Sequence, residues 1–462
     1  MKLTSAITIL GLSLLGNTAT VPLGQKRSGV AGTTAISSAA VSSSPVPRSP
    51  VPSSPVPSSA VPSRTVSRAV VPTATASGFR SVAYYADWDI YNTSYFVTNI
   101  TASTLTHLVY CFADLDANTG SVSVSDAWAD LQYPYPGDNQ SDTSSVAGNV
   151  KQLYLLKQQN RNLKTIFSIG GYSWASKFEN FTLTAQGRQT FAQSALLLIQ
   201  NLGFDGIDID WEYPSDPEHA QAMVLLLEEL RTTLDTYSAQ YAHGTHLLLS
   251  VAAPAGPANY EALNITGMDQ YLDMWNIMAY DYAGSWSNYT GDHANVYPSQ
   301  SNNNSTPGHT DGAISYYLSQ GVAAKKINFG MPLYGRSFTN TSGLGLPFGG
   351  VGSNGQGINY NVLGGPNANI TEMADVIASY SYDSTNGGTL TSFDTPNIAL
   401  LKAQYMLEKG IGGAMYWELS GDKTGPESII ATVANSVGNL DQTLNLLSYP
   451  QSNYTNIKNK MN

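Results

Sequence analysis

The sequence is poor in charged residues and in cysteine. Asp, Glu, Lys and Arg make up only 12% of its 462 residues, whereas hydrophobic residues make up 42%. A sizeable core is therefore possible, and the surface must be polar mainly through uncharged side chains, as in many extracellular proteins. Because Cys111 is the only cysteine, no disulfide can form within the chain. We expect it to be a buried strand residue.

Basic residues are also scarce, and the formal net charge is −11. Nucleic-acid phosphates call for a basic surface, so the charge excludes nucleic acid as the expected partner. His243 and His246 lie in a predicted turn, and no third residue is spaced to complete a metal site with them. No Gly-rich phosphate-binding loop follows a strand. The sequence therefore predicts neither a metal site nor a cofactor.

Long hydrophobic runs are missing as well. No stretch reaches the roughly 18 apolar residues that a membrane-spanning helix needs, so no membrane partner is expected. Residues 1–20 combine Lys2 with a short apolar run and small residues near Ala19, which is typical of a signal peptide. The polar C-terminus lacks a lipid-anchor signal. We expect secretion to the medium or the cell wall.

Residues 21–77 are expected to form a pro-segment or linker outside the core. From about Ser28 the sequence is reduced to Ser, Pro, Val, Ala and Thr, a composition typical of an extended, O-glycosylated segment. N-glycosylation sequons fit the same secreted setting. They occur at Asn92, Asn99, Asn139, Asn180, Asn264, Asn288, Asn303, Asn304, Asn340, Asn369 and Asn453.

From Phe79 onward, short apolar runs alternate with helix-length amphipathic stretches. Eight of these runs are candidate strands: Ser81–Tyr85, His107–Phe112, Lys164–Ile169, Gly206–Asp210, Leu247–Ala253, Met274–Ala279, Ile327–Pro332 and Gly413–Trp417. Eight alternating strand and helix units predict an α/β fold, a closed TIM (β/α)8 barrel over residues 78–440. A longer interval at about 337–395 predicts an inserted α+β subdomain between strands seven and eight. Residues 441–462 are expected to be a polar tail.

The most informative segment is Phe204–Pro214, in which Asp208, Asp210 and Glu212 alternate with large apolar residues. On a strand, the three carboxylates therefore point to one side, here toward the mouth of the barrel lumen. The alternative interpretation is a calcium loop or a solvated acidic edge. A calcium loop has a Gly and polar residues between its ligands, whereas the residues between these carboxylates are large and apolar, which disfavours the alternative. Three neighbouring like charges cannot all ionise, so at least one carboxyl should hold a proton near neutral pH.

The segment Asp205–Glu212 resembles the Asp-Gly-x-Asp-x-Asp-x-Glu signature of family-18 glycoside hydrolases. Further motifs agree, and the resemblance extends from about Phe79 to Ser436. They are Ser168-Ile-Gly-Gly171, Met278-Ala-Tyr280-Asp281, Gly330-Met-Pro-Leu-Tyr334-Gly-Arg336 and Gly412-Gly-Ala-Met-Tyr-Trp417-Glu418. Within the family, the chain is most similar to fungal secreted chitinases that carry the inserted subdomain. The resemblance implies chitin and N-acetylglucosamine oligosaccharides as substrates.

The resemblance also implies a retaining, substrate-assisted mechanism, which needs no enzyme nucleophile. Glu212 would protonate the glycosidic oxygen while the acetamido group of the substrate attacks the anomeric carbon. Asp210 would stabilise the positive oxazolinium intermediate, Asp208 would share a proton with Asp210, and Tyr280 would orient the acetamido oxygen. Substrate contacts are expected from Trp417, Trp286, Tyr172, Tyr85, Asp281, Met278, Tyr334 and Arg336.

Two other functions are compatible with this fold. Family-18 barrels include chitin-binding lectins without hydrolytic activity, but Glu212, Asp208, Asp210 and Tyr280 are all present here. The second alternative is an endo-β-N-acetylglucosaminidase that acts on N-glycans. The inserted subdomain and Trp286 favour a long linear chitin chain as the substrate instead. The expected function is therefore that of a chitinase. We expect the protein to be a monomer.

Overall fold

The computed structural model describes residues 78–138, 142–365 and 368–461. The signal peptide and the Ser/Pro/Val-rich segment predicted for residues 1–77 lie outside the described residues, as does the sequon at Asn139.

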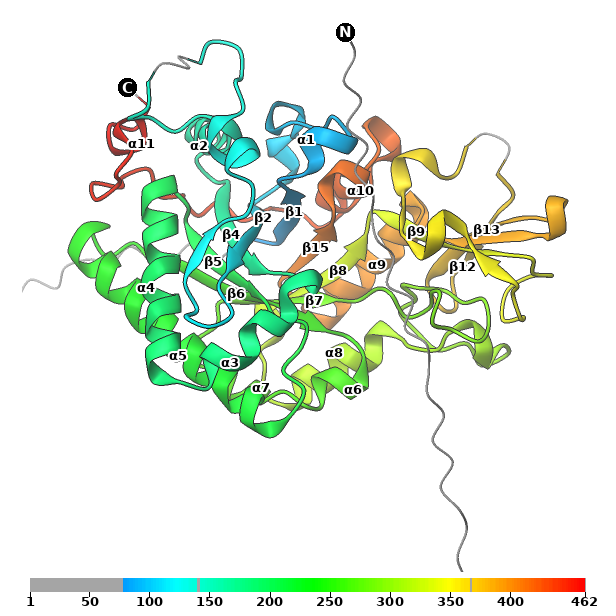
Figure 1. Ribbon diagram of the computed structural model, residues 1–462. Coiled ribbons are helices and arrows are strands. Elements are labelled where there is room, and N and C mark those ends of the chain that lie inside the picture. The colour runs from blue at the N-terminus through cyan, green and yellow to red at the C-terminus, as the bar shows by residue number, and fades with distance from the viewer. Residues whose placement is uncertain (1–77, 139–141, 366–367, 462) are drawn as a thin grey trace, which may run out of the picture. The chain divides into compact units, whose positions relative to one another are not determined.

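A closed parallel barrel forms the centre of the folded region (Figure 1). Within the described residues its eight strands are β1 (Arg80–Ala86), β2 (His107–Leu115), β4 (Lys164–Gly170), β5 (Gly206–Asp210), β6 (Leu248–Pro254), β7 (Met274–Met278), β8 (Ile327–Pro332) and β15 (Gly413–Trp417). Strand β15 pairs in parallel with β8 on one side and with β1 on the other, and β1 also pairs with β2, which closes the barrel. A short strand, β3 (Val122–Val124), extends β2 as an antiparallel hairpin. The predicted TIM barrel is confirmed, and each predicted strand overlaps an observed one.

Helices surround the barrel (Figure 1). The longer ones are α2 (Gly148–Gln159), α4 (Ala185–Leu202), α5 (Pro217–Tyr241), α8 (Thr310–Ser319), α9 (Pro396–Lys409) and α10 (Ile429–Ser436). Single-turn helices are α1 (Asp89–Asn92), α3 (Phe178–Thr182), α6 (Pro257–Tyr260), α7 (Ile265–Asp269) and α11 (Thr455–Lys458). Their ends follow local chemistry: the Thr184 side chain caps the start of α4, and Gly203 ends it at a positive φ of 81°.

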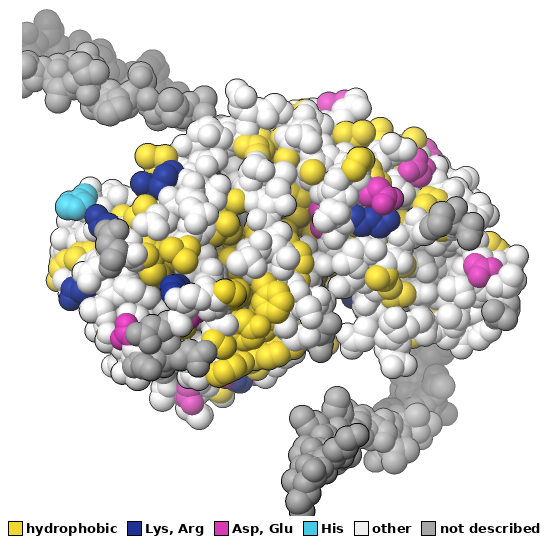
Figure 2. Space-filling view, turned by 90° about the horizontal axis from the view of Figure 1, so that it is seen from above, with side chains coloured by type: hydrophobic (Ala, Val, Ile, Leu, Met, Phe, Trp, Pro, Cys, Tyr) yellow, Lys and Arg dark blue, Asp and Glu magenta, His cyan; other side chains and the backbone are white. Residues whose placement is uncertain are grey.

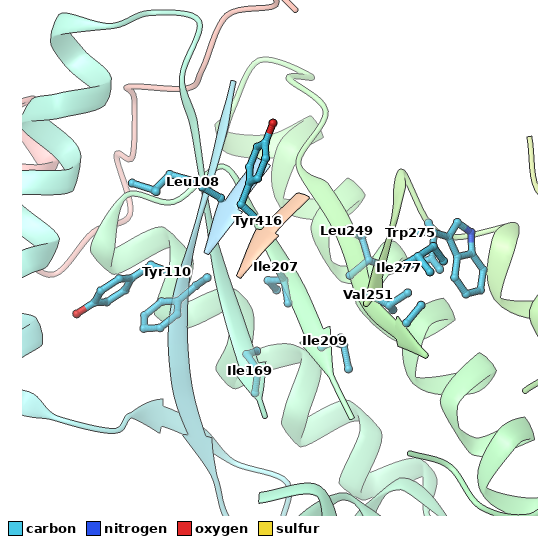
Figure 3. Close-up of a cluster of buried hydrophobic side chains, with 14 of the residues drawn as sticks. Leu108, Tyr110, Ile169, Ile207, Ile209, Leu249, Val251, Trp275, Ile277 and Tyr416 are labelled. Atoms are coloured by element: carbon cyan, nitrogen blue, oxygen red, sulfur yellow. The ribbon is translucent and has the colours of Figure 1, made fainter. Parts of the chain in front are cut away.

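The main core lies between the strands and the helices. Apolar side chains that project outward from the strands fill this layer, as Figure 3 shows for Ile207 and Ile209 of β5 and Leu249 and Val251 of β6. Because the strands are buried on both faces, a second, smaller cluster that includes Val82, Tyr84 and Met415 fills the lumen. The barrel is therefore a packed scaffold that can hold side chains rigidly at its mouth.

The insertion after β8 is an antiparallel sheet. Its strands are β9 (Tyr334–Thr339), β10 (Gly350–Val351), β11 (Ile358–Asn359), β12 (Ile370–Met373), β13 (Ala378–Asp383) and β14 (Thr389–Ser392). In the described part of this insertion the helical segments are short 3-10 turns, at Gly352–Gly355, Tyr360–Val362 and Thr385–Gly387. The insertion begins at Tyr334, directly after the barrel strand, so that its first strand is fixed at the barrel mouth.

The segment after residue 440, expected to be a polar tail, packs along the barrel. Asp441 is paired with Lys164 at 2.7 Å, and the backbone N–H of Leu446 donates to the Asp205 carboxylate at 2.7 Å. Tyr449 and Ile457 are buried. The segment is polar in composition, yet a few well-spaced apolar residues anchor it to the barrel. Its other side chains are hydrogen-bonded or solvated.

A buried ion pair ties this C-terminal segment to strand β5. Lys157 of α2 donates to Asp205 at 2.7 Å, to the Tyr449 hydroxyl and to the carbonyl of Gly203, and its side chain is fully buried. Removing one partner of a buried pair leaves an uncompensated charge, which costs about 3–5 kcal/mol. We therefore expect Lys157→Met to lower the free energy of unfolding by about that amount, as measured by urea denaturation.

The matched control is Lys409→Met on α9, whose partly exposed pair with Asp311 should contribute no more than about 1 kcal/mol. Equal losses in the two variants would show that the buried pair has no special role.

The surface reflects the low charge of the sequence. Most of the face shown in Figure 2 is white, with few Lys, Arg, Asp or Glu side chains, and hydrophobic side chains gather in its middle. Among the helices of the described residues, none is long and apolar enough to cross a membrane.

Candidate active site

A cleft of about 920 Å³ opens at the end of the barrel where the parallel strands terminate. Its walls come from the segments that follow β1, β4, β5, β7, β8 and β15, together with residues 355–357 and 359 of the insertion. Carboxyl ends of parallel strands are where active sites of α/β barrels lie. Ten of the predicted site residues line this cleft: Tyr172, Asp210, Glu212, Met278, Tyr280, Asp281, Trp286, Tyr334, Arg336 and Trp417.

Strand β5 places the acidic residues as the alternation predicts. Asp208 and Asp210 point into the barrel, where they are paired in register with Ser168 and Gly170 of β4, while Ile207 and Ile209 belong to the outer core. Glu212 lies two residues beyond the end of the strand and reaches the cleft. The three carboxyls therefore form a series from the lumen to the cleft.

Asp208 is the deepest of the three and is fully hydrogen-bonded. Its carboxylate accepts from the hydroxyls of Tyr84 (2.8 Å), Ser168 (2.7 Å) and Ser250 (2.6 Å), and from the amide of Asn276 (3.2 Å). Burial raises the pKa of Asp208, and these donors oppose the rise. Asp208 does not line the cleft, so it can act on a substrate only through Asp210.

Asp210 and Glu212 share a low-dielectric environment. Burial raises the pKa of Asp210 well above its usual value, and the charges of Glu212 and Asp208 add to the rise. Burial also raises the pKa of Glu212, and Asp281 adds to it, whereas Tyr213 opposes it. Within the described residues Asp210 Oδ1 is buried without a hydrogen-bond partner. This environment favours a proton on the pair, as general acid catalysis requires.

Two glycines allow β4 to approach Asp210 closely. The backbone N–H of Gly171 donates to the carbonyl of Asp210 at 2.8 Å. Gly170 and Gly171 have φ values of 114° and 94°, and a Cβ on Gly170 would lie 2.3 Å from the Asp210 carbonyl oxygen. The glycines of the Ser168–Gly171 motif are thus required by the backbone beside the carboxyl series.

The segment after β7 and strand β9 contribute a second charged group to the cleft. Asp281 adopts a positive φ of 62° and accepts hydrogen bonds from Arg336 Nε (2.8 Å) and Nη2 (2.7 Å) and from the Tyr334 hydroxyl (2.7 Å). Although burial alone would raise it, the pKa of Asp281 is held well below its usual value by His293 and Arg336. For Tyr280, burial and then Asp281 raise the pKa, so its hydroxyl remains a neutral donor.

Aromatic rings form the walls of the cleft. Trp417 packs against Phe112 at 5.9 Å and against Tyr84 at 5.6 Å between ring centroids. Trp286 is 58% exposed and lies over the Arg336 guanidinium, 5.2 Å from the ring centroid, and Tyr172 is 82% exposed. Exposed rings at a cleft provide apolar faces for stacking of a flat ligand face.

The prediction that Tyr85 contacts the cleft is wrong. Its ring is fully buried in the outer core, and its hydroxyl donates to the backbone of Tyr95. Tyr84, the preceding residue, points into the lumen instead. Because a strand alternates its side chains, an error of one residue moves a side chain to the opposite face.

Sequence reasoning missed further residues that line the cleft: Trp88, Phe112, Trp174, Tyr213 and Glu418. A signal was available for two of them, since Trp88 and Glu418 lie within two residues of the carboxyl ends of barrel strands. Burial raises the pKa of Glu418 to about 8, and the nearby Asp89 adds to the shift.

A closed (β/α)8 barrel with a buried carboxyl pair and aromatic walls at the carboxyl ends of its strands defines a glycoside hydrolase. The model of glycosyl hydrolases family 18 matches residues 80–422, and the chain belongs to that family.

Curated relatives and solved structures agree with the assignment. Endochitinase 1 of Metarhizium robertsii is 46% identical and chitinase 1 of Aphanocladium album 48% identical, each over 84% of this chain and 92% of the relative. Chitinase ChiA74 from Bacillus thuringiensis superimposes with a TM-score of 0.72 at 28% identity, over 79% of this chain and 71% of that one.

Proposed function

We propose that the protein is a chitinase that hydrolyses β-1,4 linkages between N-acetylglucosamine units in chitin and chitin oligosaccharides. The proposal is supported by the names of its relatives, endochitinase 1 and chitinase 1, at 46% and 48% identity. The observation that carries it most directly is the position of the buried carboxyls of Asp210 and Glu212 in an aromatic-walled cleft, where burial raises the pKa of both. Substrate-assisted retention needs this combination of an acid and a charge stabiliser without a nucleophile.

In the proposed mechanism Glu212 donates its proton to the glycosidic oxygen, and the bond from that oxygen to the anomeric carbon breaks. The carbonyl oxygen of the substrate's own acetamido group forms a new bond to the same carbon, which gives an oxazolinium ion. The Asp210 carboxylate accepts a hydrogen bond from the acetamido N–H and stabilises the positive charge of the oxazolinium ion. Water then attacks the anomeric carbon from the face that the leaving group left, and the bond from that carbon to the acetamido oxygen breaks. The water gives a proton to Glu212, so the configuration is retained.

The other residues position the substrate. The Tyr280 hydroxyl orients the acetamido carbonyl, and such pre-orientation can contribute greatly to the rate. Trp417 supports the sugar under attack, and the exposed rings of Trp286 and Tyr172 stack against the leaving-group side. The Asp281–Arg336 pair, with Met278 and Tyr334, supplies further contacts in the cleft.

The stereochemistry of the first product tests this mechanism. We expect the β-anomer to accumulate first during hydrolysis of an N-acetylglucosamine tetramer, because two displacements at one carbon restore its configuration. Proton NMR in the first minutes, before mutarotation, measures it. A matched oligomer with a free amine on the sugar under attack has no carbonyl nucleophile and should not be cleaved there. An initial α-anomer, or cleavage at the free-amine sugar, would contradict substrate assistance.

The protein is proposed to act as a secreted monomer. Residues 1–20 would direct export, and the Ser/Pro/Val-rich segment up to residue 77 would separate the catalytic barrel from the N-terminus. Signal-peptide composition and a surface poor in charge support this location.

A further inference from the structure

A buried histidine lies directly behind the charged wall of the cleft. His293 belongs to the long connection between β7 and β8 and is fully buried. Its Nδ1 is 3.7 Å from Asp281 Oδ1, and its ring lies against that of Tyr334 with 5.2 Å between centroids. No described hydrogen bond uses either ring nitrogen. Burial without such bonds is costly for an imidazole, so its position requires an explanation.

The backbone of His293 is fixed on two sides. Its carbonyl accepts from the N–H of Tyr282, the residue after Asp281, at 3.0 Å. Its N–H donates to the Ser392 hydroxyl of β14 at 3.1 Å. The backbone of His293 is therefore held beside Asp281 by the segment after β7 on one side and by the insertion on the other.

Two carboxylates face the ring, and each is already paired with a cation: Asp281 with Arg336, and Asp394 with Lys402. The charged and titratable groups that face His293 are Asp281 after β7, Tyr334 and Arg336 of β9, and Asp394 after β14. Arg336 is already engaged by Asp281 through two hydrogen bonds. A proton on the imidazole would therefore be matched by Asp281, which is the nearest carboxylate.

We infer that His293 is a positioning residue: at acidic pH its imidazolium keeps the Asp281 carboxylate ionised and in place at the wall of the cleft. The inference deepens the proposed function and rests on it for the activity test. An ionised Asp281 keeps its hydrogen bonds with Arg336 and can accept a hydrogen bond from a sugar hydroxyl. A neutral Asp281 would weaken both interactions. Chitin hydrolysis by this enzyme would thereby extend to lower pH than a cleft with an isolated Asp281 would allow.

The direction of the pH effect follows from the two groups. Burial lowers the pKa of His293 below its usual value, although Asp281 opposes this, so the ring takes up its proton only in the acidic range. Asp281 is partly exposed, and without His293 only Arg336 and Tyr334 would hold its charge. Without His293 the pKa of Asp281 should rise, since His293 and Arg336 are what hold it down. The loss of substrate affinity should then begin at higher pH.

The test compares His293→Gln with the wild type in the pH dependence of kcat/KM on a fluorogenic N-acetylglucosamine oligosaccharide. We expect the acid limb to move up by at least about half a pH unit, which is about a threefold loss on that limb. The change should lie in KM, and the alkaline limb should stay in place. In an Asp281→Asn background the same replacement should cause no further shift. A uniform loss at every pH, or a shift that persists in that background, would overturn the inference.

A measurement of stability separates this inference from the proposed function. A double-mutant cycle of His293→Gln and Asp281→Asn, followed by urea unfolding, gives the coupling between the two side chains without any substrate. The coupling should increase as the pH falls from 7 to 4.5, because the ring gains its charge there. No coupling, or coupling that does not change with pH, would refute the role of His293. Absence of hydrolysis by the wild type would refute the chitinase proposal alone.

Discussion

Replacing Glu212 by Gln should lower the turnover of N-acetylglucosamine oligosaccharides by a factor of about 10²–10⁴. The amide keeps the shape of the side chain but has no proton to donate to the glycosidic oxygen, and general acid catalysis typically contributes this much. Binding should be preserved, because the aromatic walls of the cleft are untouched. Initial rates on a soluble tetramer measure the turnover, and isothermal titration calorimetry measures the affinity of the inactive variant.

The matched control is Glu179→Gln on α3, an exposed glutamate outside the residues that line the cleft. It makes the same chemical change and should retain wild-type turnover. If Glu212→Gln kept more than a tenth of the wild-type rate, another group would have to be the acid.

Asp210→Asn is expected to reduce kcat by about 10²-fold, the usual effect of removing one preorganised charge-stabilising group. In the proposed mechanism the Asp210 carboxylate faces the positive oxazolinium ion, which a neutral amide stabilises poorly. The same replacement removes the charge that is coupled to Glu212. Since a like charge nearby raises a carboxyl pKa, its loss should lower the pKa of Glu212 and move the alkaline limb of the kcat profile to lower pH.

Asp208→Asn provides the comparison. Asp208 accepts from Tyr84, Ser168, Ser250 and Asn276, so an NH2 group at this position would meet donors and leave buried groups unpaired. We expect this variant to lose several degrees in Tm as well as activity, whereas Asp210→Asn should keep its Tm. Equal losses of stability in the two variants would contradict a catalytic role for Asp210 that is separate from packing.

Most of the active-site architecture could be predicted because it rests on local periodicity. In Gly206–Glu212 polar and apolar residues alternate strictly, so the phase of the strand and the direction of its carboxyls were evident from the sequence. Strand β1 has no alternation of polar and apolar residues from which the direction of its side chains could be predicted. Ser81–Tyr85 is buried on both faces, and nothing in its composition distinguishes Tyr84 from Tyr85. Only the closed barrel shows which of the two hydroxyls reaches Asp208.

The sequence by itself determined the barrel, the order of its strands and the acidic series that ends at Glu212, because each depends on patterns within a few residues. The tertiary structure decided which distant groups surround that series. Asp205 contacts Lys157 and Leu446. Asp281 contacts Arg336 and His293. These partners lie too far apart in the sequence for any local pattern to predict the contacts. Burial and neighbouring charges set the proton affinities of the site, and both arise only when the chain closes on itself.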